Sequence, residues 1–367
     1  MTTFQRARLQ GTQFSLPAKY YISPEIFAQE QERIFGRQWV CVGRSAQIPG
    51  SGDYLLVNLC NESLIVLRNQ SGQVRAFYNV CRHRGTRLCH EAKGKFSAAI
   101  QCPYHAWTYR LDGQLAAAPH MGEVDNFALN DYPLVSCALA EWEGFLWINL
   151  AANPEPFSKV FAPLLNRFDD WNLPSLQLGK QIVYDVQANW KLIFQNYSEC
   201  YHCSPVHPQL AVLSPSNSGR NDLMHGSFLG GYMTLNPGSS LTMSGTTNRP
   251  GIASLSYEDL QRAYYYTFMP NVLFSVHPDY AMVHRLRPIS ADRTEIVCEW
   301  YFEPESLPLG VDDAVEFWDL TNRQDWQVSE WTQLGVGSRA YTPGLYAHPE
   351  GLLAAFDQEY LKQIGNP

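Results

Sequence analysis

The sequence has no apolar run approaching the roughly 18 residues of a membrane-spanning helix, so we expect no membrane partner. Its N-terminus, MTTFQRARLQ, lacks the apolar core of a signal peptide, which predicts a cytoplasmic protein. No G-x-G-x-x-G motif follows a predicted strand, which excludes a dinucleotide site of that type in this chain. There are also no internal repeats and no low-complexity segments.

An excess of basic residues is also missing. The 27 Lys and Arg are outnumbered by 35 Asp and Glu, and the signs are interspersed, which argues against a nucleic-acid partner. The nine cysteines lack the regular spacing of a disulfide framework. We expect Cys89 not to bind a metal, because it has no matching partner motif. Apart from Cys81 and Cys102, the cysteines should be buried reduced thiols, such as Cys41, Cys60, Cys137 and Cys298.

Two pairs of cysteine and histidine stand out. Cys81-x-His83 is followed, after eighteen intervening residues, by Cys102-x-x-His105. A [2Fe–2S] cluster in which two His replace two Cys on one iron needs this ligand set. A structural zinc site also accepts two Cys and two His, but the one-residue gap in the first pair is unusual for zinc. The flanking sequences, CRHRG and CPYHAWTYRLDG, resemble the two cluster-binding loops of Rieske proteins.

A second candidate metal site follows in the segment ECYHCSPVH. A helix predicted from Trp190 to about His202 would place Glu199 and His202 on one face. Two prolines beyond it should let His207 turn back toward His202. Two His with one carboxylate form the facial triad of O2-activating non-haem Fe(II) enzymes. Zinc is the alternative, because Cys200 and Cys203 are further candidate ligands, but these two flank His202 and cannot all converge without unravelling the helix.

The order of these motifs resembles the α subunit of Rieske-type non-haem iron oxygenases, the ring-hydroxylating oxygenase superfamily, over nearly the whole chain. This resemblance implies that His202 and His207 bind a mononuclear Fe(II). It implies Asp325 as the third ligand, since Asp325 begins a family pattern completed by Glu330, Gln333 and Gly335. We expect Glu330 and Gln333 to support the site or the fold. The fallback ligands on the same helix are Asp313, Glu316 and Asp319.

The resemblance also implies a homotrimer, in which the cluster of one subunit lies near the mononuclear iron of the next. Glu199 corresponds to the family's bridging carboxylate, which hydrogen-bonds an iron-bound His on each side of that interface. We expect its partners to be His202 and His105. Many ring dioxygenases have Asp at this position, and the Glu is more similar to the branch acting on carnitine, glycine betaine and proline betaine.

That branch oxidises carbon next to a quaternary nitrogen, a cation that aromatic faces attract. The second domain offers many rings, of which two or three could form a cage and the rest should be core: Tyr201, Phe228, Tyr232, Tyr264, Tyr265, Tyr266, Phe268, Phe274 and Tyr280. We expect three histidines of this domain to be structural: His225, His277 and His284.

The fold class predicted is α+β. Residues 1–40 should form a helical segment on the catalytic domain, with a helix over 23–38. Residues 41–155 should form an all-β Rieske domain. Residues 156–367 should form a catalytic domain whose antiparallel sheet is covered by helices, in the helix-grip, START-like manner. The clearest elements are strands at 53–59, 63–69, 74–80, 144–150 and 294–303, and helices near 311–335 and 349–364.

Together these features predict the terminal oxygenase component of a multicomponent system. A separate NAD(P)H-dependent flavin and iron–sulfur reductase would supply electrons, because the chain has no dinucleotide site of its own. We expect hydroxylation or oxidative N-demethylation of a small quaternary ammonium compound with O2. The alternative is ring dihydroxylation or O-demethylation of an aromatic compound. A different class of protein, a Rieske electron carrier without oxygenase activity, is the further alternative.

Overall fold

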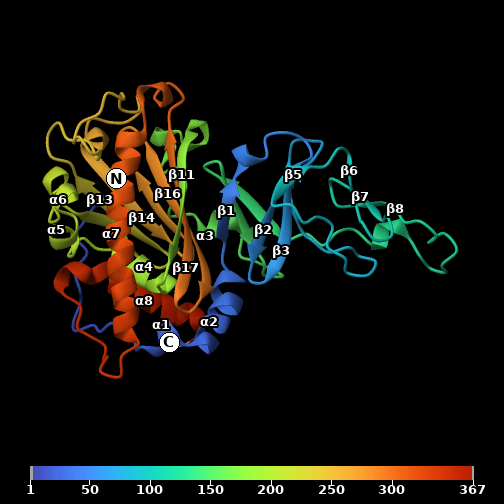
Figure 1. Ribbon diagram of the computed structural model, residues 1–367, viewed down its shortest axis with the longest axis horizontal. Helices are drawn as coiled ribbons and strands as arrows, with labels where there is room; N and C mark the ends of the chain where they lie inside the picture. Colours follow the sequence, from blue (N-terminus) through green and yellow to red (C-terminus); the bar gives the residue numbers. More distant parts are fainter. Residues whose placement is uncertain (1–2, 366–367) are drawn as a thin grey trace. The chain divides into compact units, whose positions relative to one another are not determined.

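The computed structural model describes residues 3–365 (Figure 1). Its contacts divide the chain into two units. The smaller unit is Gln31–Val160, and the larger unit combines the residues before Gln31 with those from Phe161 onwards. Among the described residues, no helix is both long and apolar enough to cross a membrane.

The smaller unit is built from three antiparallel sheets, one short α-helix, α3 (Phe157–Val160), and short π- and 3-10-helical turns. The strands predicted at 53–59, 63–69, 74–80 and 144–150 are confirmed within one or two residues at their ends. In sheet order the strands are β1 (Val40–Arg44), β10 (Phe145–Asn149) and β9 (Ala138–Trp142); β4 (Val74–Tyr78), β3 (Glu62–Arg68), β2 (Asp53–Leu59) and β5 (Lys93–Lys95); and β6 (Ala99–Gln101), β7 (Thr108–Arg110) and β8 (Leu115–Ala117).

Strand β3 divides the apolar interior of the smaller unit. Successive side chains of a strand point to opposite faces, and here both faces are buried. Ile65 and Leu67 join the cluster that also contains Cys81 and Cys102, whereas Leu64 and Val66 join a second cluster with strand β10. The segments carrying the two cysteines are therefore anchored in a packed core.

The larger unit contains a seven-stranded antiparallel sheet. The predicted α+β fold class is confirmed: the smaller unit is built mainly of β-strands, and the larger unit has an antiparallel sheet covered by helices. In sheet order the strands are β11 (Gln177–Val186), β17 (Arg293–Phe302), β16 (Ala281–Ser290), β15 (Val272–Val276), β14 (Arg262–Phe268), β13 (Phe228–Thr234) and β12 (Arg220–His225).

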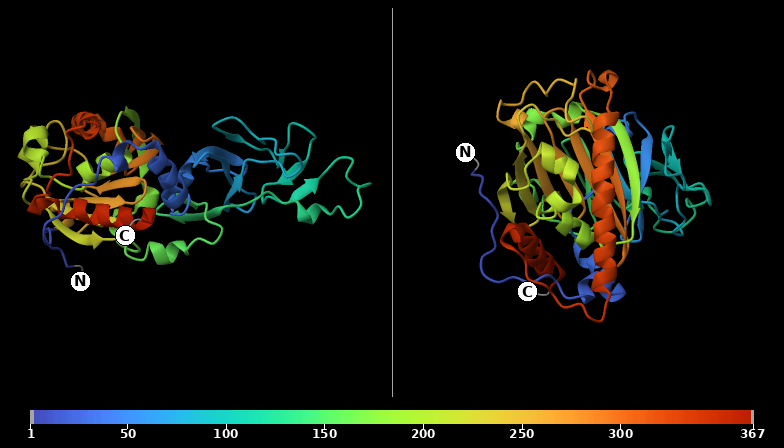
Figure 2. Two further views of the ribbon diagram at one scale, coloured as in Figure 1. Left: turned by 90° about the horizontal axis from the view of Figure 1, so that it is seen from below. Right: turned by 60° about the vertical axis from the view of Figure 1, so that its left-hand side comes forward.

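Helix α7 (Asp312–Val336) runs across one face of this sheet, with α4 (Trp190–Tyr197) beside it and α8 (Gly351–Ile364) nearby (Figures 1 and 2). The predictions of helices near 311–335 and 349–364 are confirmed. The helix predicted over 23–38 is α2 (Pro24–Glu30), continued as a π-helix to Phe35, and the short α1 (Lys19–Ile22) precedes it.

Strand β17 differs from its prediction as a strand with one solvent-facing side. Its apolar residues are buried as expected, but Glu299 on the other face is only 1% exposed. Gln181 donates to this carboxylate at 2.7 Å, and Arg285 forms an ion pair with it at 3.2 Å. Because paired charges tolerate burial far better than isolated ones, the alternating pattern did not reveal that this face is covered.

His277 predicts a pH dependence of stability. It is fully buried, and neither ring nitrogen has a hydrogen-bond partner among residues 3–365. Burial lowers its pKa from 6.5 to about 3. Below pH 6.5 the unfolded chain therefore takes up a proton that the folded chain does not, and the free energy of unfolding should fall as pH falls.

The expected slope from this group approaches about 1.4 kcal/mol per pH unit between pH 6 and 4. Urea unfolding of wild type and His277→Phe at several pH values, followed by tryptophan fluorescence, measures it. The variant should show a shallower slope. Equal slopes in the two proteins would contradict the assignment.

Candidate metal centres

The two cysteine–histidine loops have matching backbones. The N–H of the residue four positions after each cysteine donates to that cysteine's carbonyl, from Gly85 to Cys81 at 3.0 Å and from Ala106 to Cys102 at 3.1 Å. Both donors have left-handed backbone conformations, with φ of +75° and +57°. Glycine adopts this conformation freely, whereas alanine pays about 1–2 kcal/mol, so the second loop is held by its surroundings.

The side chains of these loops fit a [2Fe–2S] cluster with mixed ligands. Cys81 and Cys102 are each 2% exposed, whereas His83 and His105 are half-buried with ring centroids 4.7 Å apart. Nδ1 of His83 is buried and has no hydrogen-bond partner among the described residues, as expected for a nitrogen reserved for a metal. Cys89 packs in the same core, and burial raises the pKa of its thiol to about 11.

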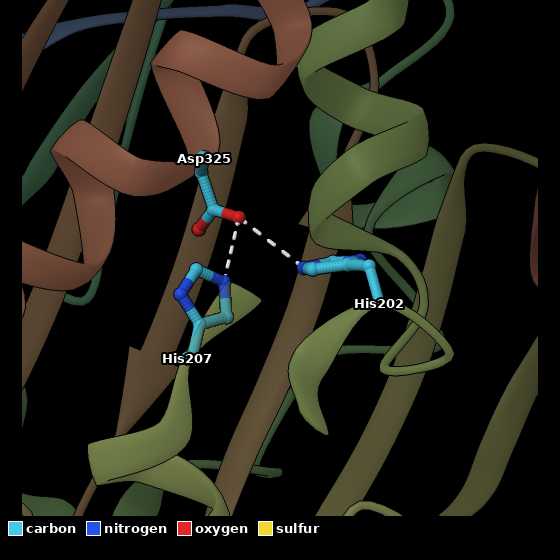
Figure 3. Close-up of side chains that lie close together, drawn as sticks. All are labelled: His202, His207 and Asp325. Carbon is cyan, nitrogen blue, oxygen red and sulfur yellow. Dashed lines mark hydrogen bonds and ion pairs between the residues drawn. The ribbon is translucent and has the colours of Figure 1, made fainter. Parts of the chain in front are cut away.

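A second group of ligands lies in the larger unit, where His202, His207 and Asp325 place one ligand atom each within 4.8 Å of one another. Asp325 projects from α7 toward both imidazoles (Figure 3). Its Oδ1 lies 2.8 Å from Nε2 of His207 and 3.2 Å from Nε2 of His202.

The local backbone differs from the predicted helix through His202. Helix α4 ends at Tyr197, because the carboxylate of Glu199 accepts the backbone N–H groups of Tyr201 and His202 and draws the chain out of the helix. A short helix, α5 (Cys203–Val206), follows. His207 then precedes α6 (Pro208–Leu213), which begins at a proline, so the chain turns back toward His202 as expected.

In each histidine, one ring nitrogen lies within hydrogen-bonding distance of Asp325 and the other contacts a second acceptor. Nδ1 of His202 lies 2.5 Å from Oε1 of Glu199, and Nδ1 of His207 lies 2.8 Å from Oε1 of Gln324. Such partners orient metal-binding imidazoles and fix their tautomers. Gln324 was not identified as a site residue from the sequence, although it is the immediate neighbour of Asp325.

The electrostatics of the group favour a cation. Burial acts to lower the pKa of His202, but hydrogen bonds to Asp325 and Glu199 outweigh it and raise that pKa to about 10. Burial acts to raise the pKa of Asp325, but hydrogen bonds from the two histidines hold it below its ordinary value. Two carboxylates that favour protonation of the neighbouring imidazoles would also favour binding of a divalent metal. The residues therefore fit a mononuclear iron.

The loop that carries His202 is closed by a disulfide between Cys200 and Cys203. The expectation of reduced thiols outside the cluster is thus wrong for this pair. The helix ends before Glu199, so the chain is free to bring the two cysteines together, with Cα atoms 4.8 Å apart. The remaining cysteines are free, and Cys60 and Cys137 are half-buried rather than buried.

The fallback acids of α7 do not reach the two histidines. Asp319 accepts from the hydroxyl of Tyr184 at 2.7 Å, Asp313 pairs with Arg249 at 2.7 Å, and Glu316 is exposed. Two other members of the family pattern support the fold: Glu330 accepts the N–H of Gln187, and Gln333 accepts that of Asn189.

A cavity of about 660 Å³ opens beside the group. Helix α7 presents Trp318, Thr321 and Asp325 to it, at the spacing of one helical face. Of the predicted aromatic residues, Tyr201, Tyr232 and Tyr265 line the cavity. Four lining residues were not identified from the sequence: Tyr197, Trp318 and two arginines near the N-terminus. The helical spacing from Asp325 is a signal that could have identified Trp318. The other predicted rings, and the three histidines expected to be structural, do not line it.

Comparison with known proteins identifies the family. Residues 173–366 match the model of the ring hydroxylating alpha subunit (catalytic domain), and residues 38–129 match the Rieske [2Fe-2S] domain. The chain belongs to the ring-hydroxylating oxygenase α subunits. This α subunit is a Rieske non-haem iron oxygenase, which contains a [2Fe–2S] cluster and a mononuclear iron and needs a reductase as its electron source.

Two relatives are similar over most of their length. The α subunit is 32% identical to the glycine betaine monooxygenase oxygenase subunit of Chromohalobacter salexigens, over 91% of this chain and 82% of the relative. It is 31% identical to the carnitine monooxygenase oxygenase subunit of Escherichia coli K12, over 89% and 86%. A solved quaternary ammonium Rieske monooxygenase, described in terms of carnitine oxidation and inter-subunit electron transfer, has a TM-score of 0.80, 26% identity and 96% coverage of both chains.

Proposed function

We propose that this oxygenase hydroxylates a carbon attached to a quaternary ammonium nitrogen, and that His202, His207 and Asp325 hold the iron beside the substrate. When bound, an Fe(II) with these three ligands keeps open positions for O2 activation. The chain's own contribution is orientation, because Glu199 and Gln324 fix the two imidazoles. The cluster would be held by Cys81, His83, Cys102 and His105.

The aromatic wall of the cavity is the observation that carries the substrate class. Tyr197, Tyr265 and Trp318 line the same cavity as Asp325, with ring centroids of 6.2 Å and 6.1 Å from Tyr265 to its two neighbours. A trimethylammonium group cannot donate hydrogen bonds, and it is held by aromatic faces and by nearby negative charge. The relatives that act on glycine betaine and carnitine support the same class.

Glu199 is proposed as the bridge for electrons between subunits of a homotrimer. Its carboxylate already contacts His202, and its side chain keeps 10% exposure, through which a second imidazole from a neighbouring copy would reach it. His105, half-buried on the cluster loop, would be that imidazole. The electron source would be an NAD(P)H-dependent reductase containing flavin and an iron–sulfur centre. We place the complete system in the cytoplasm.

Oxygen uptake tests the substrate class. The purified oxygenase, supplied with a surrogate reductase and NADH, should consume O2 on addition of glycine betaine, carnitine or proline betaine, with release of formaldehyde if a methyl carbon is hydroxylated. Benzoate and methoxybenzoates form the comparison panel. Uptake stimulated by the aromatic acids and by none of the betaines would overturn the proposal.

Trp318→Leu tests the aromatic wall. A desolvated cation–π contact is worth about 1–2 kcal/mol, so KM for the preferred betaine should rise about 5- to 30-fold with a smaller change in kcat. Trp331→Leu is the matched control, because Trp331 lies on the same helix but is 62% exposed. An unchanged KM in Trp318→Leu would contradict the assignment of this ring.

A further inference from the structure

The N-terminal strap, residues 5–15, is held at both ends by hydrogen bonds to the rest of the larger unit. Gln5 forms an antiparallel bridge with Asn221 of β12, and the N–H of Ala7 donates to Oδ1 of Asn221 at 3.1 Å. At the other end, the N–H of Ser15 donates to the carbonyl of Gly344 at 2.9 Å. Figure 2 shows the start of the chain, in blue, passing beside α8, in red.

Two arginines of the N-terminal strap line the substrate cavity. Arg6 and Arg8 flank Ala7, which is 6% exposed, and alternate residues of an extended segment lie on the same side. The guanidinium of Arg6 donates to the carbonyl of Asn217. Arg8 makes no hydrogen bond or ion pair within residues 3–365, so its charge is uncompensated by the protein there.

The acidic residues of the cavity are engaged elsewhere. Glu199 and Asp325 line it, and both bind imidazoles, as described above. His348 also lines the cavity and is exposed. The lining of the cavity thus includes two kinds of group. One is the set of carboxylates and aromatic rings at the candidate iron site, and the other is the pair of cationic side chains on the strap. A ligand with one positive and one negative end matches this distribution.

We propose that Arg6 and Arg8 bind the carboxylate of the substrate and thereby select a zwitterion over a simple alkylammonium compound. A guanidinium donates two parallel N–H groups to a carboxylate, which gives direction as well as affinity. The position of the cationic end of the substrate rests on the proposed function, whereas the preference for a carboxylate rests on the arginines alone.

Isothermal titration calorimetry of the holoenzyme without reductase tests this preference. The probes are two matched pairs, glycine betaine with choline and benzoate with benzamide, which differ mainly in the carboxylate. In one of the two pairs, the compound with the carboxylate should bind about 10-fold more tightly than the compound without it. The expected difference is modest because the two arginines are exposed. The double variant Arg6→Met with Arg8→Met should abolish that difference, and Arg8→Lys should retain part of it. Arg339→Met, at an exposed position outside the cavity, is the control.

The outcomes separate the two proposals. If neither carboxylate binds more tightly than its partner, or if the double variant keeps the difference, the role of the arginines is overturned. If benzoate shows the arginine-dependent preference and stimulates O2 uptake while glycine betaine does neither, the arginines retain their role and the quaternary ammonium substrate is lost.

Discussion

Asp325→Ala is expected to remove the mononuclear iron and leave the [2Fe–2S] cluster in place. The substitution deletes the carboxylate that lies 2.8 Å and 3.2 Å from the two imidazoles. Even outer partners of metal ligands change affinity by about 10- to 100-fold, so loss of a direct ligand should exceed that. Iron content should fall from about three atoms per chain to about two, with substrate-dependent O2 uptake lost and the visible absorbance of the cluster unchanged.

Asp319→Ala is the matched control, since Asp319 lies on the same helix and bonds to Tyr184 and Arg323. It should retain three irons and most activity, with a loss of stability of about 1 kcal/mol from the broken hydrogen bonds. Iron lost equally in both variants would show that the metal responds to damage in α7. Iron retained in Asp325→Ala would remove this residue from the ligand set.

Glu199→Gln is expected to keep both metals but to slow electron transfer from the cluster. Glutamine can still accept a hydrogen bond from Nδ1 of His202, so iron affinity should fall by no more than about 10-fold. The negative charge beside His202 is lost, and under the proposed bridging role the rate of cluster reoxidation should fall by about 10- to 100-fold. Stopped-flow absorbance of the reduced cluster, after mixing with O2 and substrate, measures this rate.

Gln324→Ala is the appropriate comparison. Gln324 supports His207 as Glu199 supports His202, but it carries no charge. It should weaken iron binding without slowing the reoxidation of the cluster in iron-saturated enzyme. Equal slowing in both variants would mean that Glu199 acts only by orienting its histidine. An unchanged rate in Glu199→Gln would refute the bridging role.

The sequence was most informative where structure depends on nearby residues. Strand β2 begins and ends at the predicted residues, because its own sequence and the turn residues that flank it determine its ends. The end of α4 was placed too late, since it depends on the Glu199 carboxylate bonding the backbone beyond it. The burial of Glu299 depends on the amide of Gln181 in β11 and the guanidinium of Arg285 in β16, and no local sequence pattern contains these partners.

The candidate site divides in the same way. The motif spacing pointed to His202 and His207, the family resemblance implied Asp325, and the structure brings the three residues together. The family pattern, rather than periodicity, singled out Asp325 among the acids of its helix. Arg6 and Arg8 reach the cavity through contacts with residues more than two hundred positions away, and nothing in the N-terminal sequence indicates this. Sequence therefore specified the metal-binding chemistry better than the shape of the pocket.

Helix α7 carries both a wall of the substrate cavity and the carboxylate beside the two histidines, because Trp318, Thr321 and Asp325 lie on one face of a single 25-residue helix. A helix shifts or rotates as a unit, so a substitution that moves Trp318 to admit a different molecule would also displace the carboxylate. The strap and strand β13 are separate elements and can change without that penalty. New substrate ranges in this scaffold should therefore arise by substitutions on the strap and β13, while α7 stays fixed.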